Sequence, residues 1–261
     1  MADDRIRLGG MALPNGVLVH GPSAWACAVR ASDGRLVVAS ERKTFRAAAV
    51  KTPLLRGPAR LAEVFALLPA VKRALPEAQL PFERPRVLAS MAASTAAVRL
   101  VRGSKLRPAA QELLTALLSF APAALALRGG ELAAYHGAEH KSIGAYEHGE
   151  PRAKEHERCG THLVGPLLVT TAIGNVLASR APEELRGPAR AAASLGAVGA
   201  SVELFAWMGR HPDSPVTKAL RRPGHELQAR LATAEPSPQQ LEVAEAALAA
   251  CLALETDGAG D

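Results

Sequence analysis

Apolar and polar residues follow two different periods along this chain. Between Gly16 and Lys43, short apolar runs flank Ser32-Asp33-Gly34, an arrangement typical of strands joined by a hairpin turn. From Leu54 to Leu75 the apolar residues recur at helical spacing with basic residues around them. This predicts one amphipathic helix, which lies either on a membrane or on the hairpin. A small β module is therefore expected to precede a helical region.

Four longer apolar stretches follow, and a final Ala-rich helix is predicted over Glu242–Leu254. Crossing a bilayer takes about 20 apolar residues, so three of the stretches are long enough. The shortest would form a re-entrant hairpin with its neighbour or a buried soluble helix. In chain order the stretches are Val87–Val98, Ala109–Leu127, Leu163–Ser179 and Ala191–Met208. The expected fold is a mainly α membrane protein with three or four apolar helices and a small N-terminal β-hairpin module, α+β overall.

The same pattern predicts the organisation of the chain. We expect an N-terminal β-rich module over residues 1–50, an amphipathic helical linker over 51–84, a membrane-embedded helical domain over 85–209, a C-terminal polar helical region over 210–256 and a disordered tail over 257–261.

Composition supports a membrane protein and narrows its partners. The chain is 48% hydrophobic and 21% charged, with a mean hydropathy of +0.06, which excludes a disordered protein and indicates a mixture of polar and embedded parts. The net charge of +6 is scattered and no nucleic-acid-binding signature accompanies it, so anionic lipid headgroups are the expected partner rather than nucleic acid. Protein partners remain open.

Location and redox state follow from charge and cysteine usage. Three cysteines without a C-x-x-C pair indicate a reducing compartment rather than a disulfide framework. Lys and Arg occur in every connecting loop, which determines orientation only weakly, and the basic N-terminal region favours a cytoplasmic N-terminus. We expect a multi-pass protein of the bacterial cytoplasmic membrane.

The strongest chemical signal is His136-Gly137-Ala138-Glu139-His140. It has the H-x-x-E-H order of inverted zinc proteases. On a helix, His140 and Glu139 lie about 40° and about 60° from His136, on opposite sides of it, so all three share one face. Gly129-Gly130 before the motif and Gly149 with Pro151 after it predict one helix over Glu131–His148. The two histidines could bind a divalent metal, with zinc the closest fit, and Glu139 could take a proton from bound water.

Other polar residues surround this motif in the sequence. Five of the eight histidines lie within residues 136–162. Glu147 returns to the same helix face but lies roughly 10 Å beyond His140, so it would belong to a second site or position a substrate. The third metal ligand is left to Cys159 or Glu203. Simpler interpretations are a polar surface helix for the two histidines, a small buried side chain for Cys159 and a helix-end residue for Glu203.

These residues resemble a known family. The segments Tyr135–Lys141, Ala145–Glu147 and Arg158–Thr161 are similar to the YqhQ-like bacterial membrane proteins, domain of unknown function family 1385. Shorter similarities extend to both ends of the chain. The resemblance implies integral membrane proteins, sometimes described as metal-dependent enzymes, without an established reaction.

Carried over by position, the resemblance assigns motif positions to His136, Glu139, His140, Glu147, Arg158, Cys159 and Glu203. The N-terminal module departs from the family pattern at Asn15 and His20, where members commonly carry a Glu and an Arg. His20 is therefore counted with Glu147 and Arg158 as part of a wider polar site, which this chain has altered or lost in part.

The sequence leads to one main functional hypothesis and two alternatives. The main hypothesis is a membrane-integral, zinc-type hydrolase, with His136 and His140 as ligands, Cys159 or Glu203 completing the site and Glu139 as general base. A peptide or lipid-linked bond near the membrane surface would be the substrate. The first alternative is a non-catalytic membrane scaffold or metal-handling protein. The second is a Cys159 nucleophile activated by His140.

Overall fold

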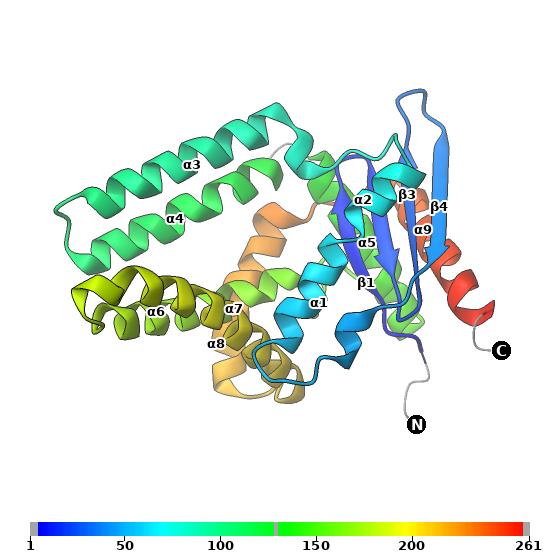
Figure 1. The fold of residues 1–261 in the computed structure, drawn as a ribbon. Helices are drawn as coiled ribbons and strands as arrows, with labels where there is room; N and C mark the ends of the chain where they lie inside the picture. The colour runs from blue at the N-terminus through cyan, green and yellow to red at the C-terminus, as the bar shows by residue number, and fades with distance from the viewer. Residues whose placement is uncertain (1–4, 128–129, 258–261) are drawn as a thin grey trace. The chain divides into compact units, whose positions relative to one another are not determined.

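The computed structural model describes residues 5–127 and 130–257 of the chain (Figure 1). Its internal contacts define two units. Unit 1 combines the segments 1–45, 68–156 and 229–261, and unit 2 combines 46–67 and 157–228. The part of the predicted tail beyond residue 257, and Gly129 of the predicted helix break, lie outside the described residues.

A four-stranded antiparallel sheet confirms the predicted β module. Its order is β1 (Gly9–Leu13), β2 (Gly16–His20), β3 (Ala24–Arg30), β4 (Leu36–Arg42). The turn between β3 and β4 contains Gly34, whose φ of 84° suits a glycine. The first strand was not predicted, because Gly9-Gly10 at its start is a poor strand former.

Two helices of unit 1 pack with this sheet. The helix α5 (Glu131–His148) has the predicted bounds, since Gly130 and Gly149 both adopt positive φ at its ends and end a helix readily. The helix α9 (Pro238–Asp257) begins four residues before the prediction, because proline fits the first helical position. Val17, Val19, Ala26 and Ala28 point to the same core as residues of both helices, including Tyr135 and Val243.

The predicted amphipathic helix over Leu54–Leu75 is wrong as a single element. The chain forms a 3-10 turn η1 (Arg46–Ala49), then α1 (Arg56–Phe65) and, separately, α2 (Leu68–Ala74). Pro69 lacks the backbone N–H that a continuous helix needs and fits the first turn of a new one. The break also assigns α1 to unit 2 and α2 to unit 1.

The apolar stretches form two helical hairpins. In unit 1, a short turn η2 (Pro81–Glu83) leads to α3 (Pro85–Gly103), which packs against α4 (Pro108–Leu127). In unit 2, η3 (Gly160–Leu163) leads to α6 (Val164–Ser179), and η4 (Glu183–Leu185) leads to α7 (Arg186–Arg210), which packs against α6. The helix α8 (Pro215–Leu227) and the π turn η5 (Gln228–Ala232) were not predicted.

Three helical segments among the described residues are long and apolar enough to cross a membrane. They cover Ala110–Leu127, Gly160–Ser179 and Glu183–Arg210. They agree with the three longer predicted stretches, whereas the shortest, Val87–Val98, lies within α3 and does not qualify.

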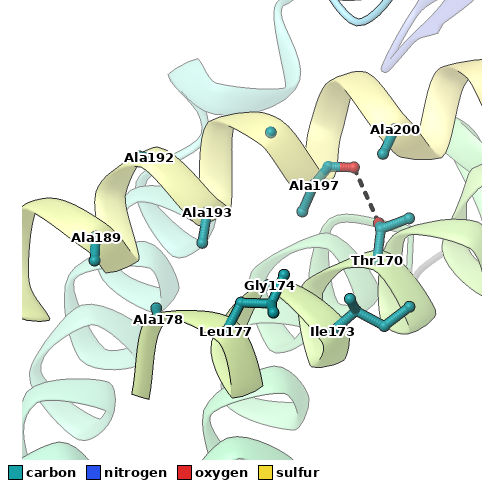
Figure 2. Close-up of a pocket in the computed structure, with 11 residues that line it drawn as sticks. Thr170, Ile173, Gly174, Leu177, Ala178, Ala189, Ala192, Ala193, Ala197 and Ala200 are labelled. Atoms are coloured by element: carbon teal, nitrogen blue, oxygen red, sulfur yellow. Dashed lines mark hydrogen bonds between the residues drawn. The ribbon is translucent and has the colours of Figure 1, made fainter. Parts of the chain in front are cut away.

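Small side chains allow α6 and α7 to approach closely (Figure 2). Gly174 faces Ala193, where a β-carbon on the glycine would lie 3.3 Å from that of the alanine. The Thr170 hydroxyl donates a hydrogen bond to the Ala197 carbonyl at 3.0 Å. The two helices border an open cavity of about 580 Å³ lined mainly by alanines. Such small-residue packing is typical of helices in lipid.

The C-terminal helix is tied to the sheet by Glu255, which suggests a test of unit 1. Its carboxylate accepts from the Ser23 and Ala24 backbone N–H groups, both at 2.8 Å, and from the Ser23 hydroxyl at 2.7 Å. Glu255→Ala should lower the free energy of unfolding by about 2 kcal/mol, because these buried donors lose a charged acceptor. Glu245→Ala, an exposed change on the same helix, is the control. Thermal unfolding followed by circular dichroism measures both, and equal losses would contradict this account.

Candidate metal centre

The two motif histidines lie side by side on α5. The rings of His136 and His140 have centroids 4.3 Å apart, as their spacing of four residues predicts for one helix face. His140 is buried and His136 partly so. Burial of two polar rings requires hydrogen-bond partners, and both are supplied by backbone carbonyl groups.

His136 is held by the segment that precedes α9. Its Nδ1 lies 2.8 Å from the Ala232 carbonyl oxygen. Two residues later the segment crosses α5 at Gly137, where a β-carbon would collide with the Ala234 carbonyl oxygen. The Ala234 N–H also donates to the Ala133 carbonyl at 2.9 Å. The glycine within the motif is thus needed for close approach of this backbone.

His140 is held in the same way by the loop after α5. Its Nδ1 lies 2.6 Å from the Lys154 carbonyl oxygen. Because a carbonyl oxygen can only accept, Nδ1 of each histidine carries the proton, and in the neutral ring the lone pair is on Nε2. A carbonyl bonded to one ring nitrogen is the usual way in which proteins orient a histidine that binds metal through the other.

Cys159 completes a group that could hold a metal ion. His136, His140 and Cys159 each offer one ligand atom to this group. Cys159 begins the η3 turn, where its sulfur accepts from the Thr161 N–H at 3.5 Å. Two imidazoles and a thiolate are donors that zinc prefers, and three protein ligands leave a fourth tetrahedral position. The donor set therefore fits a zinc-type ion, although it does not identify the metal.

Glu139 lies beside this group, at the edge of the sheet. Its side chain is buried against Gly10 of β1, where a β-carbon would collide with the carboxyl group. Burial raises the pKa of Glu139 to about 7, and the nearby charge of His136 opposes that shift. Loss of water disfavours the charged form of a carboxyl, so this group can carry a proton up to neutral pH.

Glu147 and His156 extend the polar cluster. His156 Nε2 lies 3.1 Å from a Glu147 carboxylate oxygen, and the His156 ring centroid lies 5.4 Å from that of His140. Glu147 is thus linked to the motif histidine His140 by the His156 ring, which is in hydrogen-bond contact with Glu147 and in ring contact with His140. From the sequence, His156 had no role beyond its place among the five histidines of residues 136–162.

The remaining predicted site residues have other surroundings, and their roles stay predictions. Glu203 is paired with Arg56, whose Nε donates to it at 2.7 Å. Arg158 is exposed. His20 lies over Gly9 and packs against Phe45, with ring centroids 5.5 Å apart.

Lys154 connects the two backbone segments that hold the histidines. Its carbonyl contacts His140, while its ammonium group donates to the Ala229 carbonyl at 3.3 Å and to the Thr233 hydroxyl at 3.4 Å. Ala229 and Thr233 flank the residue whose carbonyl holds His136. A nearby ion pair with Glu155, at 2.6 Å, fixes the ammonium group further.

We expect Lys154→Met to lower metal affinity about tenfold, because the segments that orient both rings are no longer joined. Lys141→Met is the matched control, since Lys141 pairs with Glu235, itself two-thirds exposed, and such surface pairs contribute little. Titration with Co²⁺, followed by its visible absorption, measures affinity and ligand geometry together. Equal affinities for the two variants would contradict a positioning role for Lys154.

Gly137 provides a second test of the same arrangement. Gly137→Ala should lower the free energy of unfolding by about 2 kcal/mol and weaken metal binding, because a backbone carbonyl must move. In Gly144→Ala the new β-carbon meets the Arg152 side chain at 3.2 Å and the His156 ring at 3.7 Å, and none of these nearest atoms is backbone. This second variant should be milder in thermal unfolding and metal titration. The reverse order would show that the approach at Gly137 is not required.

Comparison with known proteins supports the resemblance seen in the sequence. Residues 131–254 match the model of a family described as protein of unknown function (DUF1385). A protein of Bacillus subtilis (strain 168), described as uncharacterized protein YqhQ, is 34% identical over 118 residues. That match covers 42% of this chain and only 37% of the relative. No solved structure matches the chain. The residues matched by the family model include both motif histidines, Glu139 and Cys159.

Proposed function

We propose that this chain, whose residues 131–254 match the DUF1385 family model, is an integral membrane protein with a metal-dependent hydrolase site. His136, His140 and Cys159 would hold a divalent ion, most simply zinc. The bond hydrolysed would be a peptide or lipid-linked bond near the membrane surface. The proposed location is the bacterial cytoplasmic membrane, with anionic lipid headgroups as contacts and the N-terminus in the cytoplasm.

One observation gives the main support for the proposed metal site. Both histidines point Nδ1 at a backbone carbonyl, at 2.8 Å and 2.6 Å, and with Cys159 they form a group that could hold a metal ion. On a polar surface helix, nothing would require two separate segments to fix both rings in the same tautomer. A metal site requires that arrangement, because both Nε2 lone pairs must converge.

The exposed surface of the apolar helices supports the membrane location. Only 6% of the Ala110–Leu127 segment and 22% of the Glu183–Arg210 segment is buried. Leu117 and Leu195 are among the large apolar side chains that remain exposed on them. Water is a poor environment for so much apolar surface, whereas lipid is a favourable one.

The residues of the site suit hydrolysis near neutral pH. A bound zinc-type ion would lower the pKa of a water molecule and polarise a carbonyl group. Glu139 follows His136 by three residues and precedes His140, so it can receive the proton that the attacking water loses and return it to the leaving group. Glu147 holds the His156 ring beside His140, where it shapes the edge of the site.

A non-catalytic, metal-binding scaffold is the second candidate function. The observation that favours it is the position of Glu139, whose carboxyl group is buried against Gly10 of the sheet. In this case the carboxyl would serve as a buried link between α5 and β1. The metal would then stabilise the fold without turnover.

Metal content and the histidine variants test the site itself. Detergent-purified wild type should retain about one divalent ion per chain, measured by elemental analysis. His136→Ala and His140→Ala should each lose it. His148→Ala should not, because the exposed His148 ring makes its hydrogen bond with the Gly144 carbonyl of its own helix, at 2.9 Å. Wild type without bound metal, or equal retention in all three variants, would overturn the proposal.

Glu139→Gln separates the two candidate functions. The variant should keep the metal and lose hydrolysis of peptide or lipid-linked ester substrates by about a hundredfold or more, because the amide cannot accept the proton. Assays in lipid vesicles with and without a chelator give the measurement. Metal-dependent thermal stability without turnover in either protein would favour the scaffold.

A further inference from the structure

The amphipathic helix α1 lies directly along α7 within unit 2. Gly57 approaches Val202 so closely that a β-carbon on the glycine would collide with the valine side chain. The Leu54 carbonyl group approaches Gly199 in the same way. Two glycines, one on each element, thus permit contact between α1 and a helix that is apolar and long enough to cross a membrane. From the sequence, this helix was expected to lie either on a membrane or on the hairpin. Within unit 2 it packs against α7.

An ion pair joins the two helices. Glu203 lies inside the apolar Glu183–Arg210 segment. Arg56 at the start of α1 donates to both of its carboxylate oxygens, with Nε at 2.7 Å from Oε1. The Leu54 N–H adds a longer contact at 3.4 Å. An ionised carboxylate is costly within a membrane segment unless a partner neutralises it, and α1 supplies that partner.

The turn before α1 is shaped to make this contact. Leu54 has a φ of 68°, a left-handed conformation that is unusual for a leucine. It is the only non-glycine residue with positive φ among the described residues. The same residue presents its N–H to Glu203 and its carbonyl to Gly199. Such an uncommon backbone conformation persists only where its surroundings hold it.

A face of α1 next to this contact is apolar and exposed. Leu61 and Phe65 are 44% and 51% exposed, and Leu55 just before the helix is 59% exposed. The charged residues lie to one side: Arg60 is exposed, and Glu63 accepts from the Arg46 and Ala47 N–H groups. An exposed apolar stripe bordered by basic residues is typical of helices that lie in the membrane interface.

We infer that α1 lies in the interfacial layer of the bilayer beside α7, with Leu61 and Phe65 in the lipid. Lys51 and Arg60 would face the phosphate groups of anionic phospholipids. Arg56 remains with Glu203 and allows α7 to be embedded up to that residue. The occupant of the exposed face is therefore lipid. This inference rests on the proposed membrane location and is independent of the metal site.

Spin labels can test this placement in the full-length protein. Leu61→Cys and Phe65→Cys would carry a nitroxide in vesicles of phosphatidylcholine with phosphatidylglycerol. Their accessibility to oxygen, which concentrates in lipid, is compared with that to a water-soluble nickel chelate. Arg60→Cys on the charged side is the matched control. Wild type treated identically gives the background from its three buried native cysteines.

The Leu61 and Phe65 labels should have an oxygen-to-nickel accessibility ratio several times that of the Arg60 label. Equal ratios would place the stripe in water, and labels protected from both reagents would place it under a protein partner or a second copy. Either result overturns the inference. A label at Leu195→Cys, an exposed position of α7, shows whether such a result rejects only the placement of α1 or the membrane location as well. A lipid-accessible Leu195 label with a water-exposed Leu61 label would reject only the placement of α1.

The ion pair gives an independent measurement. Arg56→Met and Glu203→Met should each lower the yield of membrane-inserted protein, because each leaves one unpaired charge beside apolar surface. The double variant should recover most of the yield. Losses that simply add in the double variant would contradict the role of Arg56 as the partner that embeds Glu203.

Discussion

Two backbone carbonyl groups determine whether the histidine motif can act as a metal site. The oxygens of Ala232 and Lys154 accept from His136 and His140, and so fix the tautomer and direction of both rings. Each carbonyl belongs to a separate segment, one before α9 and one after α5. The packing of α9 and α5 with the sheet holds these segments in place, while Gly137 permits the closest approach.

One candidate ligand of the metal site directly precedes an apolar helical segment in the sequence. Cys159 directly precedes the Gly160–Ser179 segment, which is long and apolar enough to cross a membrane. If this segment crosses a membrane as proposed, a ligand at its end would lie close to the membrane surface. Glu203, in contrast, is an ionised group inside an apolar segment and is paired with Arg56. The two candidates for the third ligand, the Cys159 thiol and the Glu203 carboxylate, thus have different chemical surroundings.

The sequence predicted the elements better than their contacts. The bounds of α5 were predicted because glycines mark both ends, and the apolar stretches were visible in composition alone. Pro69 divided the predicted amphipathic helix, a local signal that the apolar period had obscured. The carbonyl contacts to the histidines could not be predicted, since any residue type supplies a carbonyl. The sequence also left the third ligand open between Cys159 and Glu203, and the group that could hold a metal ion contains Cys159.

The central claim is that His136 and His140 bind one ion through Nε2 while Nδ1 stays protonated. Nitrogen NMR of ¹⁵N-histidine-labelled protein, titrated with ¹¹³Cd²⁺ in detergent, measures this directly. Two histidines should keep a protonated Nδ1, and their Nε2 resonances should show coupling to a cadmium ion whose chemical shift indicates one sulfur ligand. Coupling through Nδ1, or histidine signals that do not respond to cadmium, would contradict the account.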